Sequence, residues 1–297
     1  MTANFLKKLI TSISPKILTL TLLVSSSAFL LKNFAVGQPV KCQMVSTSVI
    51  SSVEQAKCLL RQPRIGGQVG PVLDRLPSPL DQLLTKPTID LTKEQFRKYL
   101  VANSIREQDI GGSLDNPVSK NGSNEIARYF VIHDTSAPNF GNKPFLDNIN
   151  RSSWSGNNLA TAPKVAHIFV NRVGNSVTKI DFKTPVDATK YERNDSQIGL
   201  FLHVESVQPR RCKPKSGQTK CSEPFNDMIA PDPGFTKEQL KRLAVVYIAA
   251  SVRRGKWLIP AFHVALDQGV GDHDDPQNFI LEKWTEQLNL VLNEIRS

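Results

Sequence analysis

One short segment constrains the fold more than any other part of the chain. Four apolar or aromatic residues, Tyr129–Ile132, run directly into His133 and then into the polar residues Asp134, Thr135 and Ser136. This composition predicts a buried strand that delivers its last side chain to the edge of a sheet. Strand ends at such an edge are where α/β folds place ligand and metal sites. A single histidine is more often structural than a ligand, so the role of His133 depends on the rest of the chain.

The first 37 residues have the pattern of a secretory signal. Basic residues precede an uncharged run over residues 17–31, and small residues up to Gly37 mark a cleavage site. The alternative is an uncleaved membrane anchor, because residues 17–36 are long enough for one span. We favour cleavage, since three consecutive serines in the run weaken a stable span. Either way the sequence predicts export to the periplasm or cell envelope, or secretion, with membrane contact only through an uncleaved N-terminal segment.

The four cysteines agree with export, because they are even in number and include no CxxC pair. Zinc-ribbon spacing is absent, which argues against a metal site built from four thiolates. In an oxidising compartment the simplest interpretation is two local disulfides, Cys42–Cys58 and Cys212–Cys221. Four cysteines allow three pairings, and the sequence leaves all three open.

The chain is basic, with a formal net charge of +10, of which the four lysines of the first 37 residues account for four. A moderately basic exported protein suits an anionic surface such as cell-wall polymer or lipid head groups. No nucleic-acid-binding motif accompanies the charge, so we expect no nucleic-acid partner. The run Arg210, Arg211, Lys213, Lys215 and Lys220 is predicted to be a solvated loop, with contact to an anionic glycan as the alternative.

Residues 38–124 are predicted to form a mainly helical accessory region and linker, which packs on the main domain or binds a partner. Short amphipathic helices are expected around residues 53–60 and 80–84, and Thr92-x-x-Gln95 is a capping box that opens a third. Residues 109–124 are polar and rich in glycine, which predicts a linker or an irregular loop.

The main domain is predicted over residues 125–297 as an α/β fold, a central mixed β-sheet flanked by helices. A capping box at Thr236-x-x-Gln239 opens a long helix. The other expected elements are strands and helices in alternation: a hairpin of 164–170 with 177–182, a strand over 199–205, an apolar segment over 257–262 that ends at His263, and an amphipathic helix over 279–292.

Two common hydrolase motifs are missing from the chain. There is no HExxH, which excludes a zincin, and no GxSxG, which excludes an α/β-hydrolase. A cysteine nucleophile does not fit a protein whose thiols are all oxidised. The remaining possibility is a set of His, Asp and Glu residues at strand ends, which suits zinc with three protein ligands and an open position. Within this set we expect His167 to be a structural or cleft-wall residue instead of a ligand, while His203 either lines a cleft or packs in the core.

The order of four motifs resembles that of the zinc-dependent N-acetylmuramoyl-L-alanine amidases, the superfamily that includes the peptidoglycan recognition proteins. The likeness covers roughly residues 127–295. The motifs that carry it are Val131-Ile132-His133-x-Thr135, Val165-Ala166-His167-Ile168-Phe169-Val170, His203-Val204-Glu205, and His263 followed by Asp275-Pro276.

The resemblance implies roles for five residues. His133 and His263 would be zinc ligands, with Asp275 as the third, and Glu205 falls at the position of the catalytic glutamate. His273 occupies the position of a lysine that stabilises the transition state in many members. The spacing from His263 to Asp275 is longer than usual, and a glutamine follows Pro276 where the family has glycine. Asp274 and His273 therefore remain alternatives to Asp275 as the third ligand.

The implied function is hydrolysis of the amide bond between N-acetylmuramic acid and L-alanine, with peptidoglycan or muropeptides as substrate. Zinc can lower the pKa of water from 15.7 to about 7. Glu205 would take a proton from that water and pass it to the leaving amine, and His273 would help to stabilise the oxyanion. The alternative is a peptidoglycan-binding protein of the same fold without turnover. Such a protein would be expected to lack one of the site residues, and the chain has them all.

Overall fold

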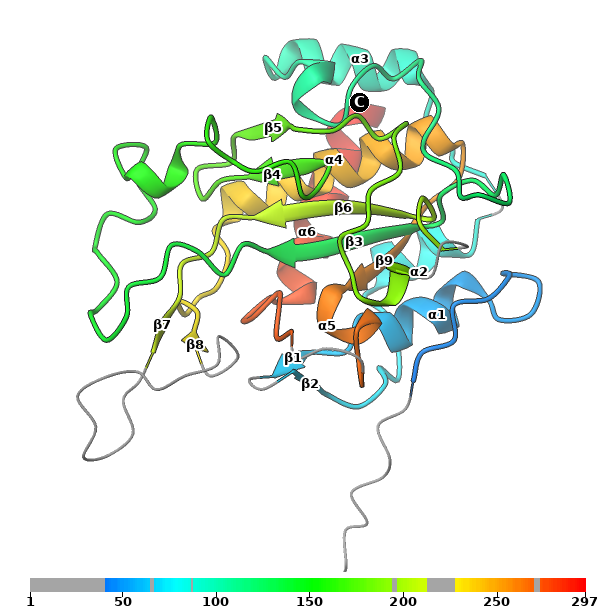
Figure 1. The fold of residues 1–297 in the computed structure, drawn as a ribbon. Helices are drawn as coiled ribbons and strands as arrows, with labels where there is room; N and C mark the ends of the chain where they lie inside the picture. The colour runs from blue at the N-terminus through cyan, green and yellow to red at the C-terminus, as the bar shows by residue number, and fades with distance from the viewer. Residues whose placement is uncertain (1–40, 65–66, 87, 194–196, 213–227, 270–272) are drawn as a thin grey trace, which may run out of the picture. The chain divides into compact units, whose positions relative to one another are not determined.

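The computed structural model describes residues 41–64, 67–86, 88–193, 197–212, 228–269 and 273–297 (Figure 1). The predicted secretory signal, residues 1–37, lies outside the described residues. None of the helices within these ranges is long and apolar enough to cross a bilayer.

A five-stranded sheet with the order β5-β4-β6-β3-β9 lies at the centre of the fold (Figure 1). The four strands β4, β6, β3 and β9 are parallel to one another, and β5 pairs antiparallel with β4. The predicted mixed sheet is therefore confirmed. The strands, in the order of the sheet, are β5 (Ser176–Thr178), β4 (Ile168–Val170), β6 (Phe201–Ser206), β3 (Tyr129–Asp134) and β9 (Ile259–Phe262).

One face of the sheet packs on the long helix α4 (Lys237–Arg254), and α4 packs in turn on a second long helix, α6 (Leu281–Arg296). The Phe130 ring of β3 meets the Tyr247 ring of α4 with ring centroids 5.2 Å apart. The predicted capping box opens α4, since Thr236 accepts a hydrogen bond from the backbone N–H of Gln239. Residues on this face are almost completely buried, as expected for the interior of a parallel sheet covered by helices.

The opposite face carries Tyr129, Val131 and His133 of β3, because side chains alternate along a strand. Helix α1 (Ser52–Leu59) covers its N-terminal end, where the Tyr129 hydroxyl donates a 2.7 Å hydrogen bond to Gln55. The short helix α5 (His263–Leu266) and the 3-10 turn η3 (Tyr191–Arg193) lie on the same face, with the Tyr191 ring against that of Phe201. The imidazole of His133, which is 2% exposed, lies on this face next to His263 at the start of α5.

The three helices predicted before residue 124 are all present, as α1, α2 (Ser78–Leu84) and α3 (Lys93–Ala102). Both halves of the predicted capping box at Thr92 form. Helix α1 contacts β9, α2 contacts α6, and α3 contacts α4 and α6, so the predicted accessory segment packs on the sheet and its helices. A short hairpin of β1 (Pro63–Arg64) and β2 (Gln68–Val69) follows α1.

The predicted irregular stretch 109–124 is irregular, and it also contributes to the core. Its apolar side chains Ile110, Leu114 and Val118 are at most 2% exposed. Gly111 has a φ of +108°, and a Cβ there would lie 2.1 Å from the Phe182 ring, so a glycine is needed for this close approach. The remaining short elements are η1 (Glu107–Asp109), η2 (Ser155–Asn157), β7 (Arg211–Cys212) and β8 (Met228–Ile229).

The hairpin of β4 and β5 is confirmed, but both strands are shorter than predicted. Strand β4 begins only at Ile168, and Val165 is 52% exposed, because the residues before it bend away from the ladder. Strand β5 ends at Thr178, since the chain turns to bring Phe182 into the core, where its N–H donates to the carbonyl of Gly111.

The predicted disulfide Cys42–Cys58 is present. It closes a loop of 16 residues and ties the segment before α1 to that helix. Cys212 is also disulfide-bonded. The partner predicted for it, Cys221, lies outside the described residues.

Candidate metal centre

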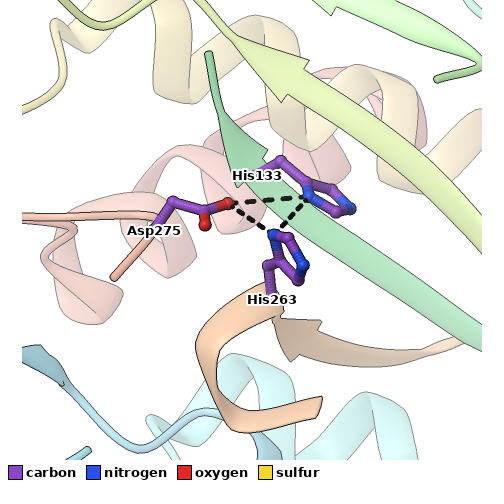
Figure 2. Close-up of side chains that lie close together, drawn as sticks. All are labelled: His133, His263 and Asp275. Carbon is purple, nitrogen blue, oxygen red and sulfur yellow. Dashed lines mark hydrogen bonds and ion pairs between the residues drawn. The ribbon is translucent and has the colours of Figure 1, made fainter. Parts of the chain in front are cut away.

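The register of the sheet brings the predicted site residues together at the carboxyl ends of three neighbouring strands. His133 of β3 pairs with Glu205 of β6. On the other side, Ile132 pairs with Phe262, the last residue of β9, so that His263 follows directly beside His133. Asp275 arrives from a loop between α5 and α6. Figure 2 shows the His133, His263 and Asp275 side chains pointing toward one another.

Three potential ligand atoms form a compact triangle. Nδ1 of His133 lies 3.0 Å from Nδ1 of His263, which lies 3.0 Å from Oδ2 of Asp275. The third side, from His133 Nδ1 to Asp275 Oδ2, is 3.6 Å (Figure 2). All three side chains are at most 7% exposed. A second group with metal-ligand geometry, formed by His263, Asp267 and His273, adjoins the first and shares His263 with it.

This triangle has the size that a tetrahedral metal ion requires. With metal–ligand distances of about 2.0–2.1 Å, two donor atoms of a tetrahedral zinc ion lie about 3.3 Å apart. The observed separations of 3.0 and 3.6 Å lie on either side of that value. Two imidazoles and one carboxylate are also a donor set that zinc uses in catalytic sites. The three residues therefore fit a metal ion such as zinc.

Comparisons with protein-family models, with curated proteins and with solved structures found no match to this chain. The resemblance to amidases therefore rests on the order of motifs in the sequence. The contacts of His133, His263, Asp275 and Glu205 define what the site can do chemically.

Of the three alternatives for the third ligand, Asp275 is the one that lies next to both imidazoles. Asp274 points elsewhere, since its carboxylate accepts a 2.6 Å hydrogen bond from the Gln277 amide and lies 3.5 Å from Arg210. His273 contacts only one of the two imidazoles, stacking on His263 with ring centroids 4.1 Å apart. Its two nitrogens lie 3.8 Å from Asp275 and 3.8 Å from Asp267, and its side chain is 41% exposed.

In the absence of a metal, a proton on His263 supplies the positive charge that balances the carboxylates of the cluster. Burial alone would lower the pKa of His263, but the carboxylates of Asp275 and Asp267 outweigh it and raise this pKa to about 10. Burial and the neighbouring His263 lower the pKa of His133 to about 3. Burial would raise the pKa of Asp275, yet His263 and His133 hold it well below its usual range. One positive charge is thus shared among residues that could instead surround a cation.

Glu205 lies beside the triangle, with Oε1 4.0 Å from Nδ1 of His133. Its side chain is 15% exposed, and its buried Oε2 atom has no hydrogen-bond partner among the described residues. Burial, followed by the charges of Asp275 and Asp134, raises the pKa of Glu205 to about 8. An acid of this kind can exchange protons near neutral pH, which is the property required of a general acid–base residue.

His167 has a structural role, as predicted. Its Nδ1 accepts a hydrogen bond from the backbone N–H of His203, and its Nε2 donates one to the carbonyl of Thr184, both at 3.0 Å. These two bonds occupy both ring nitrogens and exclude His167 as a ligand. His203 is completely buried and contacts His133, with Nδ1 3.0 Å from its Nε2.

The prediction of a solvated basic loop is wrong for Arg210. This side chain is 1% exposed, and its guanidinium donates to both carboxylate oxygens of Asp134, at 2.8 and 2.9 Å. Asp134 also accepts a 2.9 Å hydrogen bond from the N–H of Gln277. The pair therefore ties the loop that carries Asp275 to the end of β3. Lys213, Lys215 and Lys220 lie outside the described residues.

The sequence pattern did not assign a role in the site to three residues that lie around it, namely Asp134, Asp267 and Glu192. Asp134 directly follows His133, so its place at the strand end is a signal that could have been used. Asp267 follows His263 by four residues, one helical turn, and its carboxylate lies 3.1 Å from Nε2 of that imidazole. For Glu192 the only signal is the spacing Thr189-x-x-Glu192, which predicts the start of a helix and gives no indication of a site.

Proposed function

We propose that this protein is a zinc-dependent amidase of the cell envelope, which hydrolyses the bond between N-acetylmuramic acid and L-alanine in peptidoglycan. The observation that carries the proposal is the triangle formed by His133, His263 and Asp275, with the acid Glu205 4.0 Å from one corner. Three ligands and a neighbouring acid are the minimum that hydrolysis at a zinc ion needs.

Each residue of the site has a chemical task in this proposal. Zinc held by the two imidazoles and Asp275 would lower the pKa of water to about 7 and polarise the amide carbonyl. Glu205 takes the proton from the attacking water and returns it to the leaving amine, a task suited to a pKa of about 8. His273, on the exposed side of the cluster, donates a hydrogen bond to the oxyanion of the tetrahedral intermediate.

The substrate class comes from the resemblance of the motifs and from the predicted export. A protein with a secretory signal and a disulfide works in an oxidising compartment outside the cytoplasm. In the cell envelope, peptidoglycan supplies amide bonds of the required kind, and its anionic polymers suit the basic chain. The site geometry supports metal-dependent hydrolysis, and the choice of muramoyl-L-alanine as the bond rests on the motif order.

Metal analysis combined with product analysis tests the proposal. Purified protein should contain about one zinc per chain, and digestion of purified peptidoglycan should release stem peptides with a free N-terminal L-alanine. A chelator-treated sample should be inactive and should recover with zinc. New sugar reducing ends, cleavage within the peptide stem, or full activity without metal would overturn it. Tight binding to peptidoglycan without any product would favour the non-catalytic alternative.

A further inference from the structure

A chain of buried hydrogen bonds extends behind one of the two imidazoles of the metal centre. Nε2 of His133 lies 3.0 Å from Nδ1 of His203. On the other side of the His203 ring, Nε2 lies 3.0 and 3.1 Å from the two carboxylate oxygens of Glu192. His203 and Glu192 are completely buried. Neither residue forms a hydrogen bond or an ion pair with His263 or Asp275, so they do not form part of the triangle of ligand atoms.

The same short turn also reaches the second imidazole. Residues 189–192, here called the 189–192 turn, place the backbone N–H groups of Lys190 and Tyr191 at 3.0 and 2.9 Å from the carboxylate of Asp267. That carboxylate in turn lies 3.1 Å from Nε2 of His263. One turn therefore orients His133 through Glu192 and His203, and His263 through Asp267.

The direction of these hydrogen bonds decides whether His133 can bind a metal. If the Glu192 carboxylate accepts the proton on Nε2 of His203, then Nδ1 of His203 accepts the proton on Nε2 of His133. This arrangement leaves the lone pair of His133 Nδ1 free to face the triangle. The opposite arrangement would place a proton on His133 Nδ1 and block coordination. Outer residues that fix a ligand histidine in this way are a general feature of metal sites.

Glu192 is buried without an ionic partner of its own in the part of the chain that the structure describes. Its side chain is 0% exposed, and among the described residues no lysine or arginine forms an ion pair with it. Burial without such a pair raises the pKa of Glu192 to about 8. The hydroxyl of Thr189 also donates a 2.8 Å hydrogen bond to this carboxylate. If Glu192 is ionised, its carboxylate needs a compensating charge nearby, and a cation held by His133 and His263 would supply it.

We propose that Glu192 is a positioning residue of the metal centre, which acts through His203 to hold His133 ready for coordination through Nδ1. This inference rests on the proposed metal site. It adds a specific claim, namely that a buried residue without any contact to the ligand atoms controls the affinity for the metal.

The test measures the affinity for Zn²⁺ by competition with a chromophoric chelator, using the full mature protein. Glu192→Gln and His203→Gln should each weaken zinc binding by about 10- to 100-fold, the usual effect of losing such an outer contact. Because Glu192 acts through His203, the double variant should lose no more than the His203→Gln variant alone. The matched control is Asp181→Asn, which breaks the 2.7 Å ion pair with Arg253 and should leave zinc affinity unchanged.

Two outcomes overturn the inference while leaving the proposed function intact. One is a Glu192→Gln variant that binds zinc as tightly as the parent, and the other is a double variant whose losses add. If Glu192→Gln does not fold, Thr189→Val removes only the hydroxyl that orients the carboxylate, and unchanged zinc affinity in that variant also overturns the inference. A parent protein that binds no zinc overturns the proposed metal site together with this inference, so the two failures are distinguishable.

Discussion

Nδ1 of His133 lies 3.0 Å from Nδ1 of His263, although 130 residues separate the two histidines in the chain. Two imidazole nitrogens at this distance cannot both present bare lone pairs to each other, nor can both carry a proton. Either a proton or a metal ion must lie between them. With the Asp275 carboxylate 3.0 Å from one nitrogen, the arrangement has the donor geometry of a metal site, and the following predictions depend on it.

Replacing either histidine should remove the metal. We expect His133→Ala and His263→Ala to lose bound zinc and peptidoglycan hydrolysis together, because two remaining ligands hold zinc too weakly. Elemental analysis of purified variants measures the first effect, and release of L-alanine stem peptides measures the second. The matched control is His167→Gln, since both nitrogens of His167 are bonded to backbone groups away from the triangle. This control should retain zinc even if it is less stable, and a zinc-loaded His133→Ala variant would contradict the assignment.

The acidic ligand can be tested with a pair of neighbouring substitutions. Asp275→Asn should strip the metal, whereas Asp274→Asn should retain it, because Asp274 contacts Arg210 and Gln277 instead of the imidazoles. His273→Ala should also retain zinc and slow turnover, since its ring stacks on His263 and faces solvent. Zinc content and the rate of hydrolysis are measured on the same preparations. Loss of zinc in the Asp274→Asn or His273→Ala variant would show that the ligand set is wrong.

Glu205 should matter for turnover alone. Glu205→Gln keeps the shape of the side chain but removes its ability to accept and return a proton. A positioned acid–base residue contributes about 10²–10⁴ in rate, so hydrolysis should fall by that factor with unchanged zinc content. The measurement is the initial rate of peptide release at saturating zinc. Hydrolysis at the parental rate would exclude Glu205 as the acid–base residue, whatever the metal content.

The stability of the metal-free protein should depend on pH through His263. Its pKa in the folded state is about 10, above the usual 6.5, so its contribution is fully present below pH 6.5 and is lost as the pH rises toward 10. The free energy of unfolding of chelator-treated protein should therefore decrease over this window, by on the order of a few kcal/mol. Urea unfolding at several pH values measures it.

Two controls accompany the pH experiment. In the His263→Gln variant the part of this decrease between about pH 8 and pH 10 should be absent, because the group that titrates there is gone. In the zinc-loaded parent it should be much smaller, since the metal takes the place of the proton. A metal-free parent as stable near pH 10 as at pH 6.5 would contradict the ion-paired state of His263.

The Cys42–Cys58 disulfide should stabilise the fold without affecting the site. The bond closes a 16-residue loop, for which the chain-entropy estimate is about 3 kcal/mol. Replacing both cysteines with alanine should lower the free energy of unfolding by about that amount and leave zinc affinity unchanged. The mature protein should show no reactive thiol under denaturing, non-reducing conditions. Two reactive thiols would contradict the predicted disulfides.

Local patterns in the sequence were sufficient to predict most of the elements. The capping boxes at Thr92 and Thr236 open helices as expected, because a cap depends on contacts between residues three positions apart. The strand that ends at His133 and the strand that contains Glu205 were also predicted, since buried parallel strands have short apolar runs. The limits of β4 and β5 were predicted less well, because the point at which a strand leaves its ladder depends on its neighbours.

The sequence by itself determined which residue types stand at the ends of the strands and in the loop that follows α5, including His133, His263 and Asp275. What only the tertiary structure decided was which of them meet. The order β6-β3-β9 and its register set His133 between Glu205 and His263, and no local pattern specifies the order of parallel strands. The local pattern likewise did not predict that Arg210 is buried or that Glu192 lies behind His203. Contacts of this kind join segments far apart in the chain, so their energies appear only when the sheet and its loops are assembled.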